Sequence, residues 1–203
     1  MTTFVALLLF NAANGYAALD SAQPAEPVAV TPALVCSVQH AIRWKDAAWT
    51  DQQCAARARE FTASGKRWGF KPAQLFAMAI NESDLRTEAR RIDRGAVDVG
   101  LMAVRCHQAP APDYRCTNKP VRGLYVPQLM RPATNIDMGA RILETLHHGS
   151  MAGYNGGPNA REHGYPEKVA AIMAALGGVE MRVSGKRMRK LVRTISEAVL
   201  RKR

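Results

Sequence analysis

The sequence of 203 residues predicts a mainly α-helical domain with extensions at both ends. Apolar residues recur at helical spacing over several segments, whereas the alternating patterns that indicate strands are weak throughout. The length suits a single domain of about 100–200 residues with some additional chain. We therefore expect a helical domain over residues 34–178, a linker over 19–33 before it and a tail over 179–203 after it.

The first residues carry an apolar run from Phe4 to Phe10, followed by small residues at 15–18. This pattern resembles a secretory signal peptide over residues 1–18, cleaved near Ala17, although no lysine or arginine follows Met1. An apolar start that is buried or disordered is the alternative. The run is too short to cross a bilayer as a helix. Prolines within residues 19–33 indicate the linker.

The first helical pattern extends over residues 35–64 and is broken between residues 44 and 49. Thr50 or Asp51 is the expected N-cap of its second part, because both side chains can accept a hydrogen bond from the first helical turn. A turn is then expected over residues 65–70.

Glu82 is expected at the end of the next helix, which begins near Pro72. It comes directly after Asn81 and the unbroken apolar run at residues 75–80. Apolar surroundings and the negative end of the helix dipole both disfavour a charged carboxylate and raise its pKa. A general acid near neutral pH requires such a shift. A surface glutamate that closes an amphipathic helix is the alternative.

Asp98 lies between Gly95 and Gly100 in a polar segment without a helical period, so we expect a turn to present it. Two carboxylates in different surroundings, one apolar and one polar, can divide the roles of acid and base. Further along, Tyr154 and Asn155 stand among glycines and offer an aromatic ring, a hydroxyl and an amide to a sugar. A simple turn and a simple loop are the alternatives.

Two more helices are expected in the second half of the domain. The first has a capping box at Thr134 and Asp137 and ends at Gly149, and the second opens at Pro166 and ends before Gly177. The apolar face of the first consists of Ile136, Gly139, Ala140, Leu143 and Leu146. The buried residues of the second are Val169, Ile172, Met173 and Leu176. Residues 106–127 are rich in proline and are expected to form a loop.

The four cysteines have no metal-binding spacing, and we expect neither a metal site nor a cofactor. An even number behind a signal-like start favours disulfides, and we expect Cys106 to pair with Cys116 and Cys36 with Cys54. Three pairings are possible, and buried free thiols are the alternative.

The chain has 28 Lys and Arg against 17 Asp and Glu, a net charge of +11. Residues 180–203 hold nine basic and two acidic groups, so +7 of this charge belongs to the tail. Its apolar residues recur at helical spacing, as in a basic amphipathic helix that binds an acidic membrane surface or a partner. A solvated helix packed on its own domain is the alternative. No nucleic-acid motif is present, and nucleic acid is not an expected partner.

Four motifs in order resemble the lysozyme-like lytic transglycosylases of the SLT type, over about residues 70–175. They are Asn81-Glu82-Ser83, then Asp98 to Met102, then the segment from Leu129 through Asn135 to Gly139, and then Gly153 to Pro158 followed by Tyr165. The spacing around Asp98 is closest to the VirB1-like branch, which serves secretion and conjugation machines.

The resemblance implies cleavage of the β-1,4 bond between N-acetylmuramic acid and N-acetylglucosamine in peptidoglycan. Glu82 would protonate the glycosidic oxygen and then deprotonate the muramyl 6-hydroxyl, which closes a 1,6-anhydro ring. The resemblance also implies a set of substrate-binding residues: Ser83, Gly100, Met102, Tyr154, Asn155 and Tyr165. It implies a periplasmic or envelope location, peptidoglycan as substrate and a secretion or conjugation machine as partner.

Two departures from the family pattern leave alternatives open. Ala103 stands where the family carries a glutamine, and the connector at residues 149–151 is short. A degenerate domain that binds peptidoglycan without cutting it is one alternative. A lysozyme-like muramidase that hydrolyses with water through Asp98 is the other.

Overall fold

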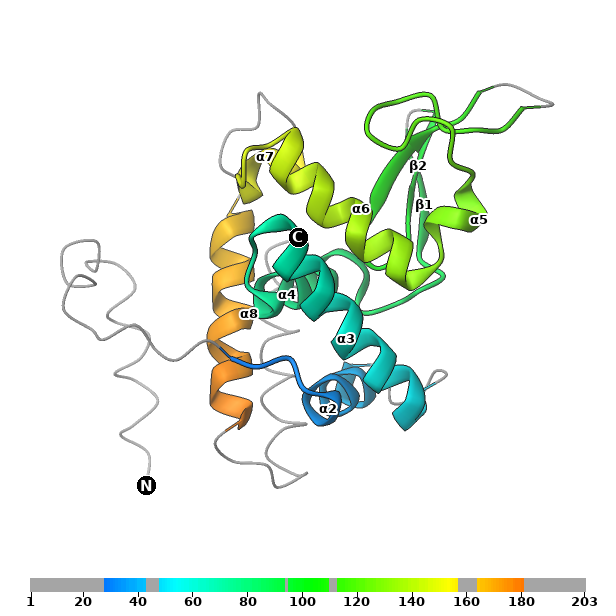
Figure 1. Ribbon diagram of the computed structural model, residues 1–203. Coiled ribbons are helices and arrows are strands. Elements are labelled where there is room, and N and C mark those ends of the chain that lie inside the picture. Colours follow the sequence, from blue (N-terminus) through cyan, green and yellow to red (C-terminus); the bar gives the residue numbers. More distant parts are fainter. Residues whose placement is uncertain (1–27, 43–47, 94, 110–112, 157–163, 181–203) are drawn as a thin grey trace, which may run out of the picture.

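The computed structural model describes residues 28–42, 48–93, 95–109, 113–156 and 164–180. Within them the chain is mostly helical and carries one small sheet, as the sequence predicts (Figure 1). The helices are α2 (Pro32–Ile42), α3 (Asp51–Trp68), α4 (Pro72–Ser83), α5 (Val126–Leu129), α6 (Pro132–Thr145), α7 (Met151–Gly156) and α8 (Tyr165–Glu180). The strands are β1 (Arg90–Asp93), β2 (Ala96–Val99) and β3 (Val104–His107).

Helix α4 forms the centre of the core. Its residues 75–79 are completely buried, so the helix is covered on every side rather than along one stripe. It packs against α3 and α8, and the rings of Phe61 and Phe76 meet edge to face with centroids 5.3 Å apart. Burial of the middle of α4 fixes the position of its last turn, which carries Glu82.

The three strands form an antiparallel sheet in the order β1-β2-β3. The expectation that a turn presents Asp98 was therefore wrong, because Asp98 lies on strand β2. Each strand has four residues, which is too short for a period of two to be distinguished from chance. The loop expected over 106–127 likewise contains the end of β3 and the first two residues of α5.

Helix α3 is longer than the sequence pattern indicates. Thr50 is its N-cap and forms a capping box with Gln53, which settles the choice between Thr50 and Asp51. The helix continues through Trp68, so the turn expected over 65–70 starts only at Gly69, whose φ is 77°. Gly65 serves close packing instead, because a Cβ there would lie 2.7 Å from the Phe70 carbonyl oxygen.

Helix α6 also begins earlier than expected. Arg131 is its N-cap, so the capping box at Thr134 was wrong. Asp137 instead accepts hydrogen bonds from Arg67 Nη1 and Trp68 Nε1, each 3.0 Å long, and thereby ties α6 to α3. The helix ends at Thr145, before the expected stop at Gly149.

The apolar faces of the last helices are close to the prediction. Residues 136, 139, 140 and 143 of α6 are buried, but Leu146 is 45% exposed, because it lies just past the helix end. Helix α8 buries Val169, Ile172 and Leu176 and passes through Gly177 without stopping. The segment around Tyr154, for which a simple loop was the alternative, forms the short helix α7.

Both predicted disulfides are confirmed, Cys36 with Cys54 and Cys106 with Cys116. The first links α2 to α3, and the second links β3 to the segment before α5. Among the described residues no helix has the length and apolarity needed to cross a membrane. The expected signal peptide and the basic C-terminal tail lie outside the described residues.

Candidate active site

A pocket of about 300 Å³ lies where the end of α4 meets the sheet and α7. Its wall combines carboxylates, guanidinium groups and one aromatic ring, so it is strongly polar. The lining residues are Glu82, Arg86, Ala89, Arg90, Arg91, Asp98, Gly100, Ala103, Arg105 and Tyr154. An open polar pocket of this kind suits a hydrophilic chain such as a glycan.

Glu82 lies in the last turn of α4 and is partly exposed to this pocket. Burial of its carboxyl raises its pKa above the ordinary value, and the negative charge of Asp98 raises it further. The Tyr165 hydroxyl and the Arg91 guanidinium act in the opposite direction, because both favour the ionised carboxylate. Burial is the largest effect, so Glu82 holds its proton to higher pH than an exposed glutamate.

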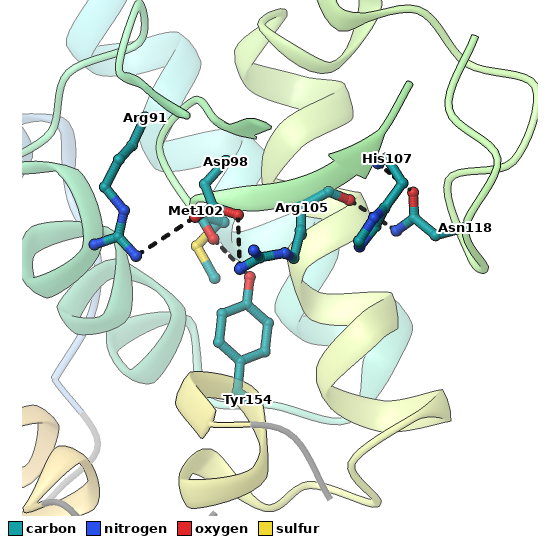
Figure 2. Close-up of polar contacts among 7 residues, drawn as sticks. All are labelled: Arg91, Asp98, Met102, Arg105, His107, Asn118 and Tyr154. Carbon is teal, nitrogen blue, oxygen red and sulfur yellow. Dashed lines mark hydrogen bonds and ion pairs between the residues drawn. The ribbon is translucent and has the colours of Figure 1, made fainter. Parts of the chain in front are cut away.

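Two tyrosines flank Glu82. The Tyr154 hydroxyl donates a 2.7 Å hydrogen bond to the Met102 carbonyl oxygen, which ties α7 to the turn after β2 (Figure 2). Tyr165 is buried at the start of α8, and its hydroxyl has no hydrogen bond of standard geometry in the described part of the chain. Burial and the nearby Glu82 raise the pKa of both phenols, so both remain proton donors.

Asp98 is held between two arginines from neighbouring strands. The strand register places Arg91 and Arg105 directly opposite it, one on each side. The Arg91 Nη2 and Arg105 Nη1 atoms each lie 3.6 Å from a different carboxylate oxygen, and the Asp98 side chain is only 11% exposed (Figure 2). Cross-strand pairs of this kind contribute about 0.2–1 kcal/mol each. Their main effect is to fix the orientation of the carboxylate.

The turn that joins β2 to β3 is fixed by the fully buried Asn135 of α6. The amide group of Asn135 donates to the carbonyl oxygens of Val99 and Leu129, both at 2.8 Å, and accepts from the Met102 N–H at 2.7 Å. Gly100 has a φ of 73°, and a Cβ there would lie 2.4 Å from Asn135 Nδ2. Only glycine permits this close approach of the Asn135 side chain, so packing accounts for the glycine at position 100.

Four of the predicted site residues come together at the pocket: Glu82, Asp98, Gly100 and Tyr154. Ser83 and Met102 lie beneath its wall, since both are buried and the Ser83 hydroxyl donates to the Ala79 and Leu101 carbonyl oxygens. Tyr165 approaches Glu82 from α8. The Asn155 side chain lies outside the described residues.

Sequence reasoning missed the arginines of the pocket wall: Arg86, Arg90, Arg91 and Arg105. Arg91 and Arg105 flank Asp98 only through strand pairing, so the register of the sheet was the missing signal. Among the described residues no cluster of His, Cys, Asp or Glu could hold a metal ion.

A small helical domain with a glutamic acid at the end of its central helix, above a short antiparallel sheet, has the architecture of lysozyme-like glycan-cleaving enzymes. The Transglycosylase SLT domain family matches residues 60–169, more than half of the chain, and the chain belongs to this family. Membership of this family supports a peptidoglycan-cleaving function of the lytic transglycosylase class. Comparison with curated proteins and with solved structures gave no match.

Proposed function

We propose that Glu82 is the acid and base of a lytic transglycosylase reaction that ends in a 1,6-anhydro product. The observation that carries this proposal is the position of Glu82, a carboxyl of raised pKa that faces the pocket from the end of a buried helix. A protonated carboxyl can donate its proton near neutral pH, as departure of a sugar oxygen requires.

The reaction balances with a single carboxyl group. Glu82 gives its proton to the glycosidic oxygen while the bond from that oxygen to the muramyl C1 breaks. The carboxylate then removes the proton from the muramyl 6-hydroxyl, whose oxygen forms the new bond to C1. Glu82 is protonated again at the end, and no water is consumed.

Asp98 is less suited to act as a nucleophile or as a base for water. Arg91 and Arg105 contact its two oxygens, and a carboxylate that is engaged by two guanidinium groups is a weaker attacking group. We therefore assign Asp98 an electrostatic role, in which its charge helps to keep Glu82 protonated. Its presence in the pocket nevertheless supports a second candidate function, hydrolysis by a muramidase mechanism.

The biological setting is proposed from the sequence resemblance. The spacing of Asp98, Gly100 and Met102 favours the VirB1-like branch, whose members open the wall for secretion and conjugation machines. The signal-like first residues support export to the periplasm, and the basic tail supports contact with an acidic membrane surface. Residues 34–178 would then form the catalytic domain, with the linker over 19–33 before it.

The test is a product analysis with three proteins. Wild type, Glu82→Gln and Asp98→Asn are incubated with peptidoglycan sacculi, and the released muropeptides are identified by mass spectrometry. We expect anhydro-muropeptides from the wild type, a loss of about a hundredfold or more with Glu82→Gln, and retained anhydro products with Asp98→Asn. Reducing ends that disappear with Asp98→Asn would establish hydrolysis instead. A protein that pellets with sacculi but releases no muropeptides would be a degenerate domain that binds peptidoglycan without cutting it, the alternative that Ala103 favours.

A further inference from the structure

The pocket wall carries more positive charge than a glycan backbone requires. Four arginines face two carboxylates, which leaves two positive charges in excess, or three when Glu82 is protonated. The sugar rings, hydroxyl groups and N-acetyl groups of the backbone are uncharged and are bound through neutral hydrogen bonds and ring contacts. The excess charge therefore indicates an anionic group on the ligand.

Two of the four arginines are engaged by Asp98, and two are not. Arg91 and Arg105 form the ion pairs across the sheet. Arg86 and Arg90 are exposed, and in the ranges that the structure describes neither forms an ion pair with a carboxylate. These two guanidinium groups are thus available to a ligand.

The positions of Arg86 and Arg90 place them beside the proposed reaction centre. Arg86 follows Glu82 by four residues, and its Nε donates a 3.0 Å hydrogen bond to the Ser83 carbonyl oxygen, which orients the rest of the guanidinium. Arg90 pairs with Val99 in the sheet register and so lies next to Gly100. A guanidinium group binds a carboxylate through two parallel hydrogen bonds, which selects for this anion.

We propose that Arg86 and Arg90 bind a carboxylate on the muramyl substituent of the peptidoglycan strand, and that they make the pocket selective for strands that carry it. This inference rests on the proposed function, because it takes peptidoglycan as the ligand. The carboxylate has two sources. One is the lactyl group of a muramyl residue without a peptide, and the other is the stem peptide attached to that group.

The experiment measures binding rather than cleavage, with the full chain carrying Glu82→Gln as the parent protein. Four ligands are titrated at low salt: strands with stem peptides, strands from which an amidase has removed the peptides, strands whose carboxyls have been converted to amides, and neutral chitotetraose. Two variants of this parent are compared with it. One carries both Arg86→Gln and Arg90→Gln, and the other carries Arg90→Gln alone. Arg122→Gln is the matched control, because Arg122 is exposed and lies outside the pocket lining.

We expect the parent to bind carboxylated strands more tightly than amidated ones, by up to about fivefold for each arginine. The double variant should lose this preference, Arg90→Lys should keep part of it, and Arg122→Gln should keep all of it. Preference for strands with peptides identifies the stem peptide as the source, and equal binding of amidase-treated strands identifies the lactyl group.

Three results would overturn the inference: equal binding of carboxylated and amidated strands, an unchanged preference in the double variant, or an equal loss of chitotetraose binding. If the double variant does not fold, Arg90→Gln alone decides the question, since no side-chain hydrogen bond or ion pair of Arg90 occurs within the described residues. A wild-type chain that cleaves no peptidoglycan would refute the proposed function, whereas the binding preference would still be measurable.

Discussion

At the scale of single residues, the protonation of Glu82 is a balance of opposing effects. Burial and the charge of Asp98 raise its pKa, whereas Tyr165 and Arg91 lower it. The proposed reaction begins with protonated Glu82, so its rate should fall as the pH rises through the pKa of this group. Neighbours that change the pKa should therefore move the alkaline limb of the pH profile.

Two substitutions should move this limb in opposite directions. Asp98→Asn removes a negative charge and should shift the limb to lower pH, whereas Arg91→Gln removes a positive charge and should shift it to higher pH. The measurement is the pH dependence of kcat on soluble peptidoglycan strands, with Arg122→Gln as control. Shifts in the same direction for both variants would contradict the electrostatic assignment of Asp98.

The raised pKa of Glu82 also predicts a cost in stability. Between the pKa of the unfolded chain and the higher pKa of the folded protein, the folded state binds more protons, so stability falls as the pH rises. The wild type bears this cost in full only above the pKa of the folded protein, whereas Glu82→Gln lacks it at every pH. We expect the variant to melt at a higher temperature than wild type at alkaline pH, with the difference disappearing at acidic pH below the pKa of the unfolded chain. Thermal melts across pH test this, and a lower melting temperature of the variant at alkaline pH would refute it.

At the scale of the elements, Asn135 links α6 to the turn that follows β2. Its three hydrogen bonds satisfy buried backbone groups at Val99, Met102 and Leu129. Tyr154 then contacts the same turn through the Met102 carbonyl oxygen. The pocket therefore depends on one buried amide group that does not itself line it.

Asn135→Ala should destabilise the fold by about 3 kcal/mol or more, because it leaves buried backbone groups without partners. Asn118→Ala is the matched control. Asn118 also makes two hydrogen bonds to backbone, but it is less buried, so we expect a loss of only about 1 kcal/mol. Urea unfolding of the two variants measures the difference. Equal losses of stability would show that Asn135 contributes no more to the folded state than Asn118.

At the scale of the whole molecule, the Cys36–Cys54 disulfide joins α2 to the start of α3, and the matched family domain begins only at residue 60. Helix α2 thus lies before the matched residues, and a covalent bond holds it to α3. The net charge of +11 is also distributed over the molecule, with a basic pocket wall in the body and most of the charge in the tail.

Replacing Cys36 and Cys54 together by serine should lower stability by about 3 kcal/mol, since the bond closes a loop with a sequence separation of 18 residues. Cleavage at low temperature should be retained, because neither cysteine lines the pocket. Chemical unfolding and a peptidoglycan release assay measure the two effects. Full stability combined with lost cleavage would contradict this division between structural and catalytic parts.

The sequence alone determined the features that depend on local patterns. Glu82 could be predicted because an apolar run and a helix end are both readable over ten residues. The mainly helical class, a cap at Thr50 or Asp51 and the presence of disulfides could be predicted for similar reasons, from spacing and composition, whereas the structure chose Thr50 and the two pairs.

Only the tertiary structure decided what surrounds Glu82. The sheet consists of strands of four residues whose pattern is too short to read, so the placement of Asp98 between Arg91 and Arg105 followed from strand register. Likewise, the burial of Ser83 and Met102 and the exposure of Arg86 and Arg90 depend on contacts between distant elements. Local sequence determines which side chains a helix or strand can present, whereas long-range packing determines which of them reach the pocket.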